Sequence, residues 1–221
     1  MKKDYTHITV ILDRTGSMES IRDDVIGGFN AFLKEQKTIP HEATMTLVQF
    51  DTQDPYEVLH HVKPLAQIPE LTAETYVPRA STPLLDAIGR GINDLNAHIA
   101  RMAESSKPEQ VVFVIITDGQ ENSSREFTRE QIAKMVKDNE VNNKWQFVFL
   151  SADFAAFSDA SDYGMSDSKR AYFSKNSVNT GVCFRLSSAI ISNYRNKTAS
   201  GVEFNEDDKN AMVDKDDKAG K

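Results

Sequence analysis

Five oxygen-bearing side chains are placed where they could bind one metal ion together. Three follow an apolar, β-branched run at residues 8–12, one lies in a Ser-Thr-Pro-Leu stretch, and one follows a second apolar run at residues 111–117. They are Asp13, Thr15, Ser17, Thr82 and Asp118. Carboxylate and hydroxyl oxygens are the ligands of hard divalent cations, so this set favours Mg²⁺, with Mn²⁺ and Ca²⁺ as alternatives.

Strand-like and helix-like patterns alternate along the chain and must position these side chains. Apolar runs predict strands at residues 7–12, 44–50, 56–62, 111–117, 145–150 and 180–185. Helical spacing of apolar residues predicts helices over residues 21–33 and 84–102, from about 128, and over 186–194. The alternation predicts an α/β fold: a Rossmann-like, doubly wound, mostly parallel sheet, in which residues 56–62 form one antiparallel edge strand.

The order of the strands decides whether the five side chains meet. In doubly wound sheets ligands bind outside the carboxyl ends of the strands, where the strand order reverses. If the order is 3-2-1-4-5-6, the strands that end at Asp13 and Asp118 are neighbours at that reversal. Both carboxylates would then converge on one crevice, and the loop that carries Thr82 could close over it.

The motifs resemble those of the von Willebrand factor type A family, in particular its short intracellular bacterial and bacteriophage members. Asp13, Thr15 and Ser17 match its D-x-[ST]-x-S motif, while Thr82 and Asp118 match its distant Thr and Asp. The resemblance covers roughly residues 6–198 and implies a metal-ion-dependent adhesion site (MIDAS). Two departures are Thr15, where Ser is commoner, and Ala80, where many members carry Gly.

The resemblance also implies how such a site works. Two carboxylates and three neutral hydroxyls do not over-neutralise a divalent cation, which can therefore accept one more anionic oxygen. In the family that oxygen comes from an Asp or Glu of a partner protein, and binding involves no bond cleavage. Short intracellular members often act as adaptors beside AAA+ ATPases of the MoxR type, and a similar partner is permitted here.

Simpler readings of the same residues remain open. Asp13 or Ser17 alone could cap a helix, and the Asp118-Gly pair could form an ordinary turn. Residues 121–123 could line the rim of the site or form a solvated loop, with equal weight on each. Asp51 and Asp153 each follow a predicted strand and are further candidates for the rim.

Other functions compete with metal-dependent recognition. A Mg²⁺-dependent phosphohydrolase of the haloacid dehalogenase type needs a second Asp two residues after the first, and that position holds Thr15. Neither phosphate-binding glycine motif of nucleotide-binding proteins is present. We therefore expect no enzymatic activity. A metal that only pins loops together, with binding elsewhere, is the third alternative.

The composition of the chain limits the classes of protein and the cellular compartments that are compatible with it. The 221 residues carry a formal charge of −7, which argues against a nucleic-acid surface. The single Cys183 excludes an internal disulfide and fits a reducing compartment. With no signal-like or membrane-length apolar segment, we expect a cytoplasmic protein without a membrane partner. We expect one domain over residues 1–200 and a charged, disordered tail over 201–221.

Overall fold

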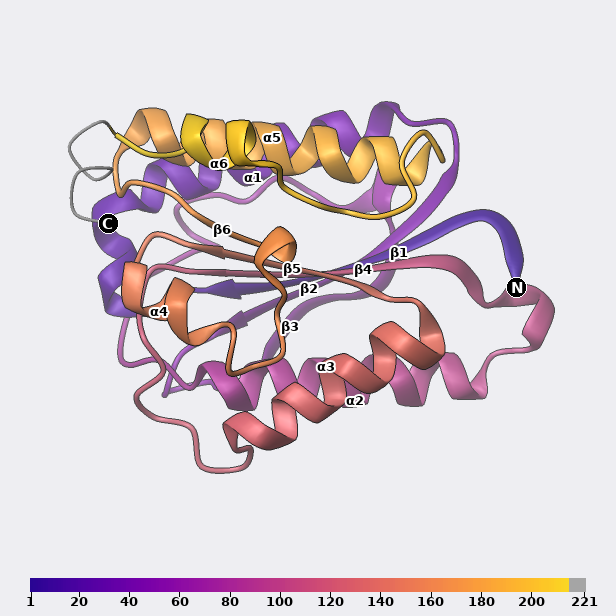
Figure 1. The fold of residues 1–221 in the computed structure, drawn as a ribbon, viewed down its shortest axis with the longest axis horizontal. Coiled ribbons are helices and arrows are strands. Elements are labelled where there is room, and N and C mark those ends of the chain that lie inside the picture. Colours follow the sequence, from indigo (N-terminus) through magenta and orange to yellow (C-terminus); the bar gives the residue numbers. More distant parts are fainter. Residues whose placement is uncertain (215–221) are drawn as a thin grey trace.

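A six-stranded sheet forms the centre of the molecule in the computed structural model, which describes residues 1–214 (Figure 1). The strands are β1 Lys2–Asp13, β2 Glu42–Phe50, β3 Glu57–Pro64, β4 Pro108–Thr117, β5 Gln146–Ser151 and β6 Arg170–Tyr172. Their order in the sheet is β3-β2-β1-β4-β5-β6. Only β3 pairs antiparallel, so the predicted α/β fold is confirmed. The order is the one on which the convergence of Asp13 and Asp118 depended, although the sixth strand is not the predicted segment.

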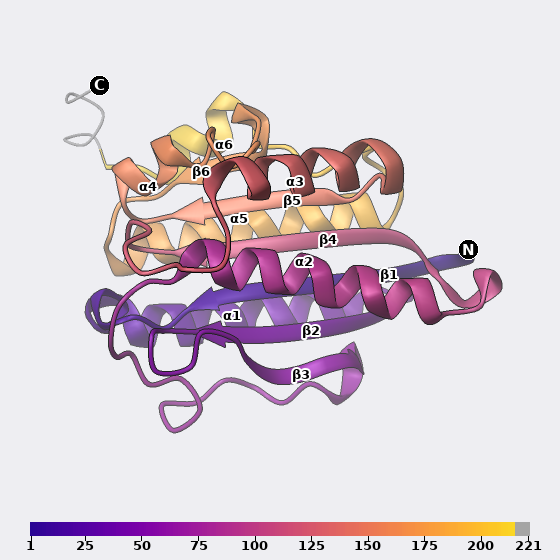
Figure 2. The same cartoon turned by 90° about the horizontal axis from the view of Figure 1, so that it is seen from below.

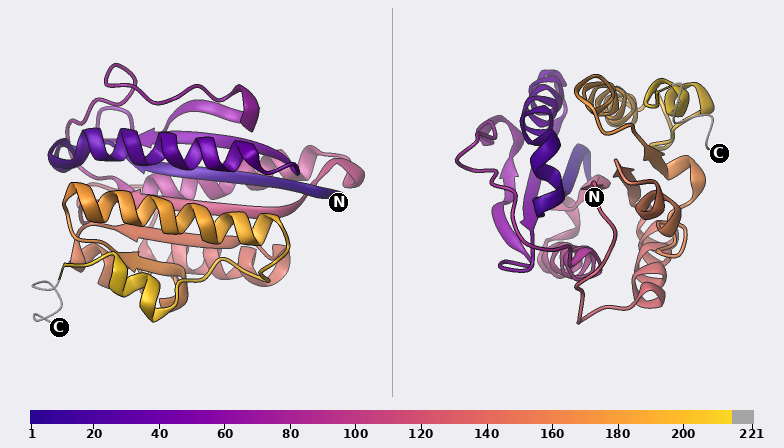
Figure 3. Two further views of the ribbon diagram at one scale, coloured as in Figure 1. Left: turned by 90° about the horizontal axis from the view of Figure 1, so that it is seen from above. Right: turned by 90° about the vertical axis from the view of Figure 1, so that its left-hand side faces the viewer.

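Helices cover both faces of the sheet. They are α1 Arg22–Thr38, α2 Leu84–Arg101, α3 Arg129–Asn143, α4 Phe154–Asp159, α5 Ser177–Arg195 and α6 Glu206–Ala211. Figures 2 and 3 show α2 and α3 over one face and α1 and α5 over the other. Two apolar cores follow from this, one under each helix layer, and β1 and β4 are buried between them. This burial explains why the strands at the centre of the sheet are almost wholly apolar.

The register of β1 and β4 places their last residues side by side. Leu12 pairs with Ile116 in the parallel ladder, so Asp13 and Thr117 end the two strands at the same level. The strand order reverses at this pair, because β2 and β5 lie on opposite outer sides of it. The place at which Asp13 and Asp118 were predicted to converge is therefore the carboxyl end of β1 and β4.

The last predicted strand is wrong. Residues 180–185 lie inside α5, and the sixth strand is the short β6. Buried side chains in α5 recur with helical spacing: Thr180, Cys183, Phe184, Ser187 and Ile191. Asn176 caps the helix by accepting the backbone N–H of Asn179 at 2.9 Å. The cap and the packing against α1 outweigh the strand propensity of the β-branched and aromatic residues in this segment.

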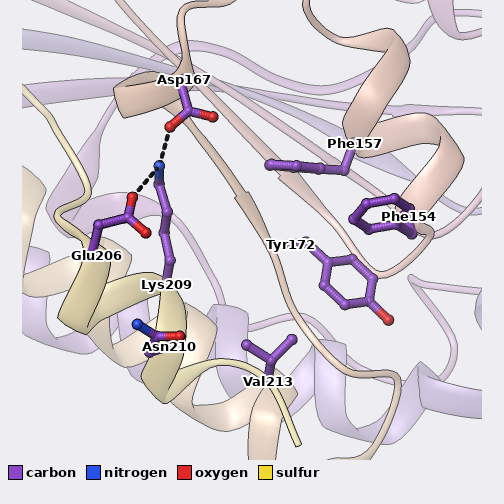
Figure 4. A pocket seen from close by; sticks show the side chains of 8 residues that line it. All are labelled: Phe154, Phe157, Asp167, Tyr172, Glu206, Lys209, Asn210 and Val213. Atoms are coloured by element: carbon purple, nitrogen blue, oxygen red, sulfur yellow. Dashed lines mark hydrogen bonds and ion pairs between the residues drawn. The ribbon is translucent and has the colours of Figure 1, made fainter. Parts of the chain in front are cut away.

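The expected disorder does not hold for residues 201–214. Val202, Phe204 and Met212 are fully or almost fully buried against the core under α1 and α5. The intervening α6 has a capping box at Asn205, and Lys209 binds the carboxylates of Asp167 and Glu206 (Figure 4). A few well-spaced apolar anchors thus fold a segment whose composition is mainly charged. The remainder of the predicted tail, 215–221, lies outside the described residues.

Within residues 1–214, no helix is both long and apolar enough to span a bilayer.

Candidate functional site

Asp13 is the innermost residue of the candidate site. It is the last residue of β1 and its side chain is fully buried. Oδ1 accepts the backbone N–H of Thr15 at 2.7 Å, and Oδ2 accepts the hydroxyl of Thr117 at 2.6 Å. These bonds hold the carboxylate at the β1–β4 junction and orient it toward the loop that carries Thr15.

Ser17 joins the first motif to Asp118. Its hydroxyl donates to Oδ1 of Asp118 at 2.5 Å and lies 3.2 Å from the hydroxyl of Thr15. The reading of Ser17 as a helix cap is therefore not supported, because its hydroxyl is directed across the crevice. Four of the five predicted residues are thus linked by hydrogen bonds: Asp13, Thr15, Ser17 and Asp118. Thr117 adds a further bond to Asp13.

Thr82 reaches the same place from a separate loop. A Cβ added at Gly119 would lie 3.3 Å from the hydroxyl of Ser17 and 3.6 Å from that of Thr82. The two hydroxyls thus border one small space beside the glycine backbone. The structure brings all five predicted residues close to one another, and their carboxylate and hydroxyl oxygens are of the kinds that could hold a hard divalent cation.

A buried polar network holds the Thr82 loop against the end of β1. The hydroxyl of Tyr76 donates to the backbone carbonyl of Asp13 at 2.6 Å. The carboxylate of Asp51 accepts from the guanidinium groups of Arg14 at 2.7 Å and Arg79 at 2.9 Å. Asp51 is fully buried, so it anchors this loop and does not line the rim as predicted.

Ala80 adopts an unusual backbone conformation in this loop. Its φ is +59°, the left-handed region that glycine enters freely and alanine enters at about 1 kcal/mol or more. The backbone N–H of Gly16 donates to its carbonyl at 3.1 Å, which ties the two loops together. The alanine therefore keeps a loop shape suited to glycine, at some cost in stability.

The loop after Asp118 supports the site by hydrogen bonding. Asn122 accepts the backbone N–H of Thr82 at 3.0 Å, and Glu121 accepts that of Leu85 at 2.9 Å. These side chains fix the start of α2 and the Thr82 loop. They therefore neither simply line the rim of the site nor form a solvated loop, the two alternatives considered from the sequence. Asp153, the other predicted rim residue, caps α4 by accepting the backbone N–H of Ala156 at 2.7 Å.

The carboxylates of Asp13 and Asp118 are both buried, and a positive charge beside them would stabilise their ionised forms. Burial raises the pKa of Asp13 to about 7, although hydrogen bonds from Thr117 and Thr15 lower it, and the charge of Asp118 adds to the increase. The ammonium of Lys175 lies 2.5 Å from Oδ2 of Asp118. A positively charged group thus already contacts one of the predicted ligands.

Sequence reasoning missed Lys175. The residue lies 57 positions after Asp118, in the connection between β6 and α5, and belongs to no motif. Only the fold brings this connection to the carboxyl edge of β4. No sequence signal distinguishes it from the other lysines of the chain.

A surface pocket of about 370 Å³ lies elsewhere, between α4, β6 and α6 (Figure 4). Its lining includes Phe154, Phe157, Tyr172 and Lys209, but none of the five predicted ligands. Among the described residues, no three His, Cys, Asp or Glu side chains gather as a metal cluster. The candidate site differs from such clusters, because three of its five donors are hydroxyls.

No protein-family model matches the sequence, and no curated protein sequence matches it. Solved structures do share its fold. Proximal thread matrix protein 1 from the mussel byssus, with a zinc-occupied MIDAS motif, is 12% identical with a TM-score of 0.56, over 85% of this chain and 46% of that one. A von Willebrand factor type A protein from Catenulispora acidiphila is 12% identical with a TM-score of 0.54, over 84% and 42%.

Manganese-loaded TRAP protein of Plasmodium vivax is also similar, at 12% identity and a TM-score of 0.52, over 80% of this chain and 71% of that one. The chain spans less than half the length of the mussel and Catenulispora proteins. At such low identity the likeness concerns the fold. The strand order, the two helix layers and these neighbours show that the chain has the fold of a von Willebrand factor type A domain.

Proposed function

We propose that this chain is a metal-dependent protein-interaction module. A divalent cation is held by Asp13, Thr15, Ser17, Thr82 and Asp118, and it coordinates an Asp or Glu carboxylate of a partner protein. One observation supports the proposal: oxygen-bearing side chains from three separate chain segments lie close to one another at the carboxyl end of β1 and β4.

The charges of the site explain why it would bind a partner. Two carboxylates balance the charge of a divalent cation without exceeding it, so an incoming carboxylate still gains from coordination. Mg²⁺ is the cation that the donor set favours, since it prefers oxygen ligands and accepts water in the remaining positions. The zinc and manganese named for two proteins of similar fold support a divalent cation in general.

Recognition without bond cleavage is part of the proposal. A phosphohydrolase would need an acid or base two residues after Asp13, where Thr15 offers a hydroxyl that lies 3.2 Å from Ser17. Phosphate-ester turnover that depends on Asp13 would contradict this part. The partner class is a cytoplasmic protein that presents an Asp or Glu residue, and an AAA+ ATPase of the MoxR type is the candidate that the family resemblance suggests.

Two measurements test the function. Calorimetric titration with Mg²⁺ and Mn²⁺ should show binding to the wild-type chain and none to D13N or D118N. Peptide pools that differ only by Glu or Gln at one position should then retain the wild-type chain on the Glu pool, in Mg²⁺ but not in EDTA. D153N is the matched control: it removes the same charge at the same sheet edge, but from the cap of α4.

The outcomes separate the alternatives. Retention that EDTA or D118N leaves unchanged would exclude metal-dependent recognition. A rise in melting temperature with Mg²⁺, without Glu-dependent retention, would instead indicate a metal that only stabilises the loops.

A further inference from the structure

Lys175 connects the candidate metal site to the segment between β6 and α5. Its ammonium lies 2.5 Å from Oδ2 of Asp118 and donates a 2.9 Å hydrogen bond to the backbone carbonyl of Ser17. The other oxygen of Asp118 accepts the hydroxyl of Ser17. Oδ1 of this carboxylate therefore accepts a hydrogen bond, whereas the buried Oδ2 has the ion-pair contact with Lys175 but accepts no hydrogen bond from the described residues.

The backbone on both sides of Lys175 is held in place. The N–H of Ser174 donates to the carbonyl of Met212 at 3.0 Å, and the hydroxyl of Ser174 accepts the N–H of Asp214 at 2.8 Å. On the other side, Asn176 caps α5. The side chain of Lys175 is nevertheless 33% exposed, whereas that of Asp118 is fully buried. The main chain is thus anchored, while the four-carbon stem is free to swing toward solvent.

An ammonium group and a divalent cation repel each other when both contact the same carboxylate oxygen. A protonated lysine offers donors and no lone pair, so it cannot act as a metal ligand. At a separation of a few ångströms inside a partly buried site, its charge repels the cation strongly. For a tightly bound cation to use Oδ2 of Asp118, the ammonium must move away.

We propose that Lys175 is a tethered competitor of the metal ion. In the metal-free chain its ammonium neutralises Asp118 and bridges that residue to Ser17. Metal binding displaces the ammonium, so the lysine sets the metal affinity below the value that the five donors alone would give. This inference rests on the proposed function, because it concerns the same site.

Calorimetric titration of the full chain with Mg²⁺ and Mn²⁺ tests the inference. K175M should bind the ions on the order of tenfold more tightly than the wild type, because it removes one positive charge from the carboxylate. K175R keeps the charge and should stay close to wild type. K209M is the matched control, since it makes the same charge change at an ion pair with Asp167 and Glu206, away from the site (Figure 4).

Unfolding in urea gives a second readout. Without metal, K175M should be less stable than wild type, because the buried carboxylate of Asp118 loses its counter-charge. Saturating Mg²⁺ should then stabilise K175M by more than it stabilises the wild type. K175Q, which keeps a polar side chain, serves for both measurements if K175M does not fold.

Equal affinities for K175M and K209M, or weaker binding by K175M, would overturn the inference, as would the absence of metal binding in both wild type and K175M. The titration involves no partner, so its outcome is independent of the peptide experiment. Tighter binding by K175M without Glu-dependent retention would overturn only the proposed recognition. Equal affinities with Glu-dependent retention would overturn only the role of Lys175.

Discussion

The hydroxyl of Thr117 donates a 2.6 Å hydrogen bond to Oδ2 of Asp13 and so joins the last residues of β4 and β1. These are the two strands at which the order of the sheet reverses. The bond is buried, and neither side chain is exposed to solvent. It therefore sets the orientation of the innermost carboxylate from the neighbouring strand.

Removal of this hydroxyl should affect both the fold and the metal site. T117V is nearly isosteric but leaves a buried carboxylate oxygen without its donor, which costs about 1–3 kcal/mol of unfolding free energy. Metal affinity should also fall, because Asp13 loses a contact that fixes its direction. Urea unfolding and calorimetry measure the two effects. T117S keeps the hydroxyl and should retain both properties; a T117V variant with unchanged metal affinity would contradict the orienting role.

Gly119 should tolerate no side chain if a cation is bound beside it. A Cβ at this position would lie 3.3 Å from the hydroxyl of Ser17, in the space between the hydroxyls of Ser17 and Thr82. G119A should therefore weaken Mg²⁺ binding by about tenfold or more, because Mg²⁺ requires near-ideal geometry. The melting temperature without metal should change little. G27A is the control: nothing lies within 4 Å of its added Cβ, in the middle of α1.

Asp51 should be essential to the position of the Thr82 loop. Burial alone would raise its pKa, but the backbone N–H of Asp54 and the guanidinium groups of Arg79 and Arg14 outweigh burial and lower it. D51N would place an amide against two cations, and breaking a buried ion pair in this way costs about 3–5 kcal/mol.

An exposed ion pair provides the comparison for D51N. The E126Q variant breaks the contact between Glu126 and Arg90 on the surface, where a pair contributes about 1 kcal/mol or less. Urea unfolding of both variants measures the contrast. If D51N were as mild as E126Q, the buried network would not anchor the loop.

His7 should make the stability of the protein depend on pH. Its buried ring lies 2.9 Å from the hydroxyl of Thr44 and 3.1 Å from that of Thr9. Burial, together with smaller effects of the charges of His98 and His61, lowers the pKa of His7 to about 3. Between that value and the unfolded value of about 6.5, the unfolded chain binds one more proton than the folded chain.

The contribution of His7 is therefore fully present above about pH 6.5 and decreases as the pH falls toward 3. Between pH 7.5 and 5, the wild type should lose about 2 kcal/mol more unfolding free energy than H7Q, at 1.4 kcal/mol per unit below pH 6.5. Urea unfolding at both values measures the difference between the two proteins, in which the titration of other groups cancels. Parallel pH profiles would contradict the assignment.

Local patterns in the sequence were enough to predict most of the sheet and to select the candidate ligands. Apolar runs and helical spacing depend on neighbouring residues, so they located β1, β2, β4 and β5 and most of the helices. Asp13 and Asp118 each follow such a run directly, and the strand order then brings them together. Their convergence followed from topology, because the carboxyl ends of parallel strands meet at one edge.

Other features depend on contacts between segments that are distant in the chain. Residues 180–185 have strand-like composition, but the packing of α5 on α1 and the cap at Asn176 make them helical. The segment that includes α6 is polar by composition, yet Val202, Phe204 and Met212 pack into a core made mainly by other elements.

The five candidate ligands could be selected from the sequence, whereas the roles of Lys175 and Asp51 could not, because these two residues act through contacts between distant segments. A motif identifies a residue through its immediate neighbours, and Asp13, Thr15 and Ser17 carry that signal. A charged group is paired by whatever the fold places within a few ångströms, and the sequence alone does not encode that distance. The sequence by itself therefore determined which oxygens could meet, and only the tertiary structure decided which cations and loops surround them.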